Sequence, residues 1–159
     1  MIIRDYSPQD LPDIVELMVP AFEPIFASFE DVLGQSLYTA MFPQGVEVQR
    51  QVAKDACTAP ENHTLVAEEN GRVVGFLVYK FHDDGETGEI YLLAVDPKAQ
   101  KNGIGSALNL KALERLKEGG MKIAYVGTGG DDGHAPARRA YEKAGFTPFP
   151  QVQYYQKLD

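Results

Sequence analysis

The most informative segment of the chain reads Gln100-Lys101-Asn102-Gly103-Ile104-Gly105-Ser106 and lies between a predicted strand and a predicted helix. Two glycines separated by one residue let the backbone approach a ligand closely. The N-terminus of the following helix presents unpaired N–H groups and the positive end of the helix dipole. The segment therefore predicts a pyrophosphate site, to which Lys101 adds one local cation.

Two common nucleotide-binding patterns fit this segment poorly. A dinucleotide fingerprint needs a third small residue where this chain has Leu108, and it normally opens a parallel strand–helix–strand unit. A phosphate loop needs a Gly-Lys pair followed by Ser or Thr, and no Gly-Lys pair occurs in the sequence. Both patterns are therefore disfavoured.

The residues before this segment predict antiparallel strands. Two segments, residues 64–69 and 72–81, are rich in apolar residues that alternate with polar ones or follow one another. Asn70-Gly71 between them is typical of a two-residue hairpin turn. After a polar loop over residues 82–88, a third strand is predicted from Glu89 to Val95. The middle of the chain is therefore a β-meander that leads into the glycine segment.

Helical periodicity dominates the first third of the chain. Ser7-Pro8-Gln9-Asp10 is typical of a capping box, and the helix that follows is predicted to end at Pro20. A second helical region covers roughly residues 29–57, and Pro43 and Gly45 divide it into two pieces.

The remaining elements alternate between helix and strand. A helix that begins near Ile104 ends at Gly119-Gly120. The other predicted elements are strands at residues 2–6 and 123–126, a helix at 135–144 and the final strands within 146–158. The pattern predicts an α+β fold with a mostly antiparallel sheet, in a single domain over residues 1–159.

Composition narrows the classes of function. The net charge is 15 − 23 = −8, which disfavours general nucleic-acid binding. Cys57 is the sole cysteine, so neither an intrachain disulfide nor a cysteine-based zinc site can form, and no cluster of metal ligands is present. With no apolar run long enough for a membrane span and no signal-peptide pattern, we expect a cytoplasmic protein without a membrane partner.

Three motifs in order resemble the GNAT family of acyl-CoA-dependent N-acyltransferases. They are Leu93-Ala94-Val95-Asp96-Pro97, residues 100–106 and Tyr141-Glu142-Lys143-Ala144-Gly145-Phe146, and the match covers roughly residues 89–147. The resemblance implies a central sheet with a splayed strand pair and helices on both faces. It also implies acetyl-CoA as cosubstrate, without a metal. Its pantetheine arm would bond to the main chain near Leu93, Ala94 and Val95, and its pyrophosphate would bond to Lys101, Asn102, Gly103, Ile104, Gly105 and Ser106.

The resemblance also implies how an amine would be acetylated. Acyl transfer needs a neutral amine, a stabilised oxyanion and a protonated thiolate leaving group. By position in the family motif, Tyr141 is the acid that protonates the thiolate. Glu89 is the candidate base, on a strand face predicted to include Tyr91 and Leu93.

Other candidates for the base stay open. Asp131 and Asp132 precede the tyrosine helix, and water or His134 can also accept the proton. His134 stands where family members often carry an asparagine that contacts the cofactor, so it is also a candidate cofactor contact. The segment before it, residues 127–133, is longer and richer in glycine than the family pattern, which leaves both roles open.

The acceptor is predicted only by class. Aromatic residues crowd the first helices, and some of their rings could face a substrate pocket: Phe22, Phe26, Phe29, Tyr38 and Phe42. The net charge favours a cationic acceptor, either a small molecule or a peptide with a primary amine. A homodimer is compatible with the sequence. The competing hypothesis is a catalytically silent module that binds acyl-CoA and regulates another process.

Overall fold

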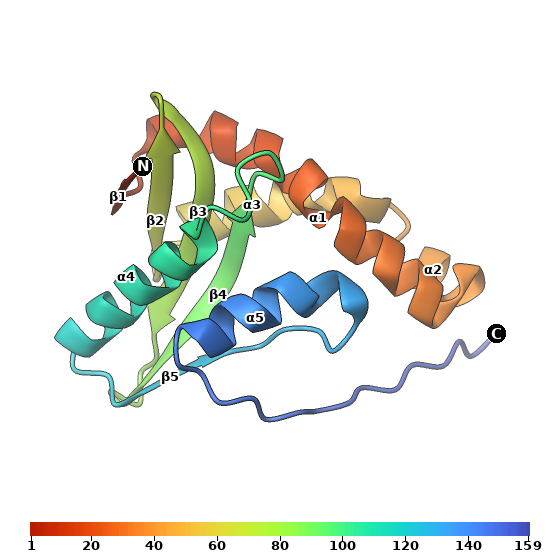
Figure 1. The fold of residues 1–159 in the computed structure, drawn as a ribbon. Helices are drawn as coiled ribbons and strands as arrows, with labels where there is room; N and C mark the ends of the chain where they lie inside the picture. Colours follow the sequence, from red (N-terminus) through yellow and green to blue (C-terminus); the bar gives the residue numbers. More distant parts are fainter.

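The computed structural model describes residues 1–159 and contains one five-stranded sheet in the order β1-β2-β3-β4-β5 (Figure 1). The strands are β1 (Ile2–Asp5), β2 (Asn62–Glu69), β3 (Arg72–Phe81), β4 (Thr87–Val95) and β5 (Ile123–Val126). The first four pair antiparallel, whereas β5 pairs parallel to β4. The predicted α+β fold with a mostly antiparallel sheet is confirmed.

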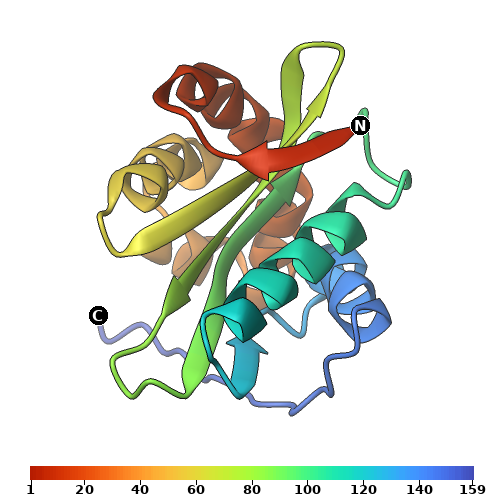
Figure 2. The ribbon, with the colours of Figure 1, turned by 90° about the vertical axis from the view of Figure 1, so that its left-hand side faces the viewer.

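Helices lie on both faces of the sheet. They are α1 (Leu11–Leu33), α2 (Gln35–Met41), α3 (Val48–Thr58), α4 (Ile104–Glu118) and α5 (Ala135–Lys143), with single turns η1 (Pro8–Asp10), η2 (Gly45–Glu47) and η3 (Asp132–His134). Figure 2 shows α1 and α3 on one face, and α4 with α5 beside it on the other. None of the helices combines the length and the apolar character needed to cross a bilayer.

The two faces of the sheet each bury a core. Along β2, Leu65 packs toward α4 whereas Val66 packs toward α1, because side chains alternate across a strand. Burial of each large side chain contributes about 1.5–3 kcal/mol. Cys57 packs against the core on the α1 face, and burial raises the pKa of its thiol to about 11, as fits a structural thiol.

The predicted hairpin at Asn70-Gly71 is confirmed. Asn70 and Gly71 both have positive φ angles, 51° and 77°, which a two-residue turn of this kind requires. The strands on either side, β2 and β3, begin and end within two residues of the predicted positions.

The prediction that the first helix ends at Pro20 is wrong. Helix α1 continues through Pro20 and Pro24 to Leu33. A proline inside a helix removes one backbone hydrogen bond. Here the buried stripe continues on both sides of the prolines, from Met18 to Phe26, and its packing offsets that loss.

The second helical region, predicted from about residue 29, begins at Gln35. Gly34, with φ of 76°, separates α1 from α2, so Phe29 belongs to the end of α1. The predicted interruption near Pro43 and Gly45 is confirmed, since α2 ends at Met41 and α3 begins at Val48.

The predicted final strands are absent. Residues 147–159 form an extended tail without secondary structure, and all of them are exposed. The tail lacks a strand partner in the chain, and Pro148 and Pro150 remove two of the N–H donors that a ladder would use.

Strand β1 is tied to the start of the helices by an ion pair. Both guanidinium nitrogens at the tip of Arg4 donate to the Asp10 carboxylate at 2.8 Å, and Arg4 Nε donates to Glu68 at 2.9 Å. The backbone N–H of Ser7 also donates to Asp10 at 2.7 Å, as the predicted capping box requires. Asp10 is therefore a buried acid with three donors around it.

The splayed pair lies between β4 and β5. Their pairing runs from Thr87 opposite Ile123 to Ile90 opposite Val126, where β5 ends. Strand β4 continues to Val95, so its last five residues have a strand neighbour on the β3 side only. This unpaired edge forms one wall of the site.

Candidate active site

A cleft of about 490 Å³ opens where β4 extends beyond β5. It is lined by α1, the end of β4, the loop before α4 and the first turn of α4, Gly133 of η3, and α5. Eight of the ten residues predicted to hold acetyl-CoA line this cleft: Leu93, Ala94, Val95, Lys101, Gly103, Ile104, Gly105 and Ser106. The structure thus brings the strand and glycine motifs together around one hollow.

The glycine loop delivers the N-terminus of α4 to the cleft. Gly103 precedes the helix with φ of 77°, a left-handed conformation that favours glycine, and Lys101 adopts a similar value of 68°. No side chain caps this helix. Its first N–H groups are therefore free of a side-chain cap and can bind an anion.

Gly105 lies in the first turn of α4 and lines the cleft. A methyl group built there would meet only Val95 and Leu93 side chains, at 3.8 and 3.9 Å, which is ordinary contact. The protein itself therefore has room for a methyl group at this position of the cleft lining.

Two cations that the sequence reasoning did not assign also line the cleft. Arg139 and Lys143 lie one turn apart on α5, and together with Lys101 they surround the hollow with positive charge. All three side chains are exposed. Their spacing of four residues puts both α5 cations on one helix face, a signal that was readable in the predicted helix at residues 135–144.

Tyr141 is adjacent to the cleft without lining it. It is buried on α5, next to the lining residue Ala140 and one turn after Ala137. Its ring packs edge-on against Phe146, with centroids 5.9 Å apart. Burial raises the pKa of Tyr141 to about 12, so the phenol is protonated at neutral pH.

Glu89 belongs to a polar cluster on the α1 side of the sheet. Its Oε2 atom lies 3.1 Å from His82 Nε2, accepts a hydrogen bond from the Tyr125 hydroxyl at 3.1 Å, and lies 3.4 Å from Lys80 Nζ. The Tyr125 hydroxyl and His82 Nε2 are 2.9 Å apart. The carboxylate is thus held by residues from the neighbouring strands and the loop before β4.

The predicted strand face of Glu89 is wrong in part. A register shift between Val78 and Tyr79 leaves Tyr91 without a partner, because Tyr79 pairs with Ile90 and Val78 with Leu92. Such a bulge reverses the alternation beyond it. Glu89 therefore shares the α1 face with Leu92, whereas Leu93 packs on the α4 side.

The glycine-rich segment before α5 is hydrogen-bonded to α5 and to α1. Arg138 donates to the carbonyl oxygens of Gly129 and Asp131 at 2.6 and 2.7 Å, and Gly133 N donates to the Ser28 hydroxyl at 3.1 Å. A side chain at Gly133 would come within 2.8 Å of the α1 backbone. Close approach to α1 thus explains this glycine.

His134 and Asp131 form a pair beside this segment. His134 Nδ1 lies 2.6 Å from Asp131 Oδ1, and the imidazole stacks at a tilt 5.6 Å from Phe29. Burial raises the pKa of Asp131, yet hydrogen bonding outweighs burial and leaves it below its usual range. Neither residue, nor the exposed Asp132, nor Asn102 is among those that line the cleft.

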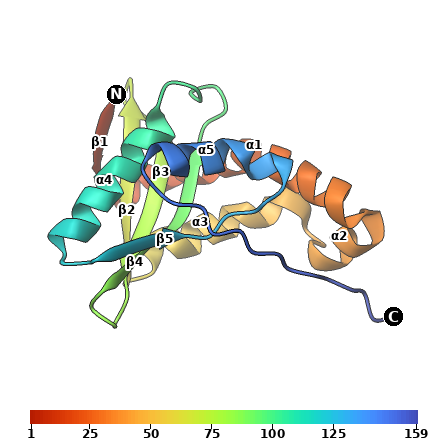
Figure 3. The same ribbon diagram turned by 60° about the horizontal axis from the view of Figure 1, so that its bottom comes forward.

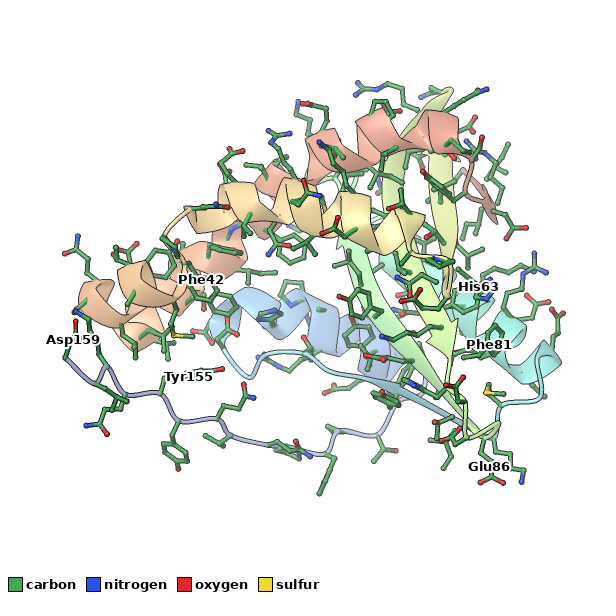
Figure 4. The ribbon with its side chains drawn as sticks, turned by 180° about the vertical axis from the view of Figure 1, so that it is seen from behind. Phe42, His63, Phe81, Glu86, Tyr155 and Asp159 are labelled. Carbon is green, nitrogen blue, oxygen red and sulfur yellow. The ribbon has the colours of Figure 1, made fainter.

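The aromatic residues of the first helices have two different positions. Phe22 lines the cleft. Phe26 is buried and contacts Phe42 edge-on at 5.2 Å, and Phe29 stacks on Phe42 at 5.5 Å. Tyr38 joins the group at 5.6 Å from Phe42. Most of this cluster is therefore packing between α1 and α2 (Figure 4).

Comparison with known proteins identifies relatives. Over 94 residues the chain is 39% identical to a mycothiol acetyltransferase of Thermomonospora curvata, which covers 58% of this chain and 30% of that protein. Over 119 residues it is 34% identical to a mycothiol acetyltransferase of Saccharomonospora viridis, covering 70% and 38% respectively. The chain thus spans about a third of the length of these curated relatives.

A solved structure and a family model complete the comparison. The PaiA N-acetyltransferase of Thermoplasma acidophilum, solved in complex with coenzyme A, superposes with a TM-score of 0.67 at 17% identity, covering 92% of this chain and 89% of that one. At that identity the likeness shows the fold. The model of the Acetyltransferase (GNAT) family matches residues 22–146. The chain therefore belongs to the GNAT family of acetyltransferases.

Proposed function

We propose that this domain transfers an acetyl group from acetyl-CoA to a primary amine by direct attack in a ternary complex. The observation that carries the proposal is the uncapped N-terminus of α4, which opens onto a cleft along the unpaired end of β4. The names of the curated relatives support acetyl as the transferred group.

The cleft suits the two chemically different parts of acetyl-CoA. Backbone groups of residues 93–95 can pair with the amides of the pantetheine arm, as an added strand would. The helix N-terminus accepts the pyrophosphate, and Lys101, Arg139 and Lys143 supply the positive charge that the chain as a whole lacks. Local charge thus outweighs the net charge of −8.

Each of the two proton transfers has its own residue: Glu89 accepts the amine proton, and Tyr141 donates a proton to the thiolate. The amine nitrogen attacks the thioester carbonyl carbon, the carbon–sulfur bond breaks, and the amine proton passes to Glu89. At about 3.3 Å per residue, Glu89 lies about 13 Å along β4 from Leu93, so a chain of several waters would carry that proton. Tyr141 protonates the departing thiolate and regains its proton from solvent.

The acceptor is proposed to be a cationic amine. The overall negative charge raises the local concentration of cations. Phe22 contributes an apolar wall to the cleft, which suits the carbon skeleton of a small amine or a peptide.

Turnover of acetyl-CoA with a panel of amines tests the proposal. The panel contains polyamines, aminosugars, amino acids and peptides with a free amino group, and release of free thiol is the readout. We expect thiol release that depends on one amine class. Tight calorimetric binding of acetyl-CoA without turnover on any amine would instead favour the silent binding module.

A further inference from the structure

A short turn between β3 and β4 holds the backbone of His82 in place. The N–H of His82 donates to the carbonyl of Thr87 at 3.0 Å, and the N–H of Gly85 donates to the carbonyl of His82 at 3.1 Å. Asp84 stabilises the same turn, because its carboxylate accepts hydrogen bonds from the backbone N–H groups of Glu86 and Thr87, both at 2.8 Å. Figure 3 shows the turn at the lower end of the sheet, beside β5. These hydrogen bonds fix the point from which the imidazole leaves the chain.

The imidazole of His82 is held by two neighbours. Its ring stacks on the ring of Tyr125, with centroids 5.6 Å apart and an angle of 15° between the planes. Its Nε2 atom lies 3.1 Å from Glu89 Oε2 and 2.9 Å from the Tyr125 hydroxyl. The side chain is 33% exposed, and Nδ1 makes no hydrogen bond within the protein. One ring nitrogen therefore faces the proposed base, whereas the other is free to exchange protons with solvent.

These contacts determine which nitrogen of neutral His82 carries the proton. The Tyr125 hydroxyl has a single proton, which it donates to the Glu89 carboxylate. The two groups around Nε2 are then the carboxylate and the phenol oxygen, and both can only accept a hydrogen bond from it. The neutral imidazole is therefore protonated at Nε2, and the lone pair is on Nδ1. Two donors, Nε2–H of His82 and the hydroxyl of Tyr125, thus orient the carboxylate of Glu89.

Protonation of His82 changes the charge around Glu89. Histidine is the side chain that gains a proton closest to neutral pH. The charged and titratable groups around this contact are Lys80 on β3, Asp84 in the turn, Glu89 on β4 and Tyr125 on β5. Lys80 Nζ already lies 3.4 Å from the carboxylate, so protonated His82 is a second cation beside it. A carboxylate next to two cations is held more firmly in its charged form and is a weaker base.

We propose that His82 is a positioning residue for the general base, which orients the Glu89 carboxylate through Nε2–H and weakens it as a base when Nδ1 is protonated. The inference rests on the proposed function, because His82 acts through Glu89. While His82 is neutral, the carboxylate is oriented and has one cation beside it, Lys80, and it accepts the amine proton. Once His82 is protonated, the carboxylate stays ionised but accepts that proton less readily, and acetyl transfer slows.

Kinetics of two His82 variants test this role with an amine that the unsubstituted chain acetylates. Protonation of His82 should lower kcat about three- to tenfold, as an acidic limb of the pH–rate profile. In His82→Gln the side-chain amide replaces Nε2–H as donor but gains no proton, so we expect full kcat above the limb and no limb. In His82→Leu we expect kcat about tenfold lower above the limb, with acetyl-CoA affinity unchanged. The matched control is His63→Gln, a histidine that stacks on Tyr79 at 5.3 Å on the α4 side of the sheet, and it should keep the original profile.

Carbon-13 NMR of the Glu89 carboxyl tests the same role without turnover. The signal should shift twice with pH, once when Glu89 gains a proton and once when His82 does, and His82→Gln should remove only the second shift. Identical Glu89 titrations with and without His82 overturn the proposal, as does an unchanged acidic limb in His82→Gln or a normal kcat in His82→Leu. If amines are still acetylated, the proposed function survives those results. Both shifts without turnover of any amine support the coupling of His82 to Glu89 and contradict the proposed function instead.

Discussion

The hydroxyl of Tyr125 donates a hydrogen bond of 3.1 Å to the carboxylate of Glu89, and the two residues face each other in the register of β4 and β5. Theirs is the last pair but one before the strands separate. Partial burial and then the Glu89 carboxylate raise the pKa of Tyr125, so it remains a donor at neutral pH. The point where the sheet opens is thus also the point where the proposed base is held.

Glu89→Gln should lower kcat about 10²–10⁴-fold, the range for a lost general base. The amide keeps the size of the side chain but accepts no proton from the amine. Acetyl-CoA affinity, measured by calorimetry, should be unchanged because the cleft lies further along β4. The matched control is Glu86→Gln, an exposed acid just before β4, which should keep full turnover. Near-normal kcat in Glu89→Gln would show that water or another group, and not Glu89, acts as the general base.

Tyr125→Phe should lower kcat about tenfold and leave acetyl-CoA affinity and melting temperature unchanged. A hydrogen bond to a charged group contributes about 1.5–3 kcal/mol, and tenfold corresponds to about 1.4 kcal/mol. The role of Tyr125 is positioning, so the loss should appear in kcat rather than in KM. Ile123→Ala, two residues earlier on β5, is the control. An equal loss in both variants would point to a general weakening of β5.

Gly105→Val should weaken acetyl-CoA binding at least about tenfold, or roughly 1.4 kcal/mol. A Cβ atom at this position makes only ordinary contacts, and because Gly105 lines the cleft beside the helix N-terminus, we expect the branched side chain to obstruct the cofactor. Gly103 is a poorer probe, because its φ of 77° would strain any other residue. Gly127→Ala, at a position open to solvent, is the control for folding. Unchanged calorimetric affinity in a folded Gly105→Val variant would contradict the assignment.

Asp10 predicts an acid-dependent loss of stability. The hydrogen bonds from Arg4 lower the pKa of Asp10 against the opposing effect of burial. A lowered folded-state pKa gives stability that is present above the unfolded value of about 3.9 and is lost as pH falls through the folded value. Asp10→Asn should cost about 1–3 kcal/mol at neutral pH and flatten the dependence of the urea midpoint below about pH 4. Asp31→Asn, an exposed acid on α1, should do neither.

Local sequence signals predicted the parts of the fold that depend on neighbours in the chain. Asn70, Gly71 and Gly103 have positive φ angles, and such requirements are visible in residue type. Hence the hairpin and the glycine loop between β4 and α4 were predicted correctly as backbone features, and the resemblance connected them with α5.

The features that the sequence did not predict depend on packing between residues far apart in the chain. Pro20 does not end α1, because the helix is held by core contacts that no local rule contains. The bulge at Val78 and Tyr79 moves Glu89 to the face of Leu92, and only the pairing of β3 with β4 shows it. Likewise, the hydrogen bonds of His82 and Tyr125 to Glu89 join three segments, so spacing alone could not reveal them.

Tyr141→Phe should lower kcat about 10²–10⁴-fold with little change in acetyl-CoA affinity, since the ring and its packing on Phe146 are retained. The matched control is Tyr79→Phe, another buried tyrosine whose pKa burial raises, but which packs in the core facing α4. The control should be nearly silent in turnover.

The raised pKa of Tyr141 determines when the phenol can give up its proton. At about 12, the pKa lies about 3.5 pKa units above that of a typical thiol, so the phenol keeps its proton until charge develops on the departing sulfur and donates it through a hydrogen bond that strengthens at that point. Loss of that proton would not limit the rate below about pH 11, so the pH–rate profile should lack a basic limb from Tyr141. Near-normal kcat in Tyr141→Phe, with chemistry shown to be rate-limiting, would remove Tyr141 from the mechanism. A large fall in melting temperature would instead identify its hydroxyl as structural.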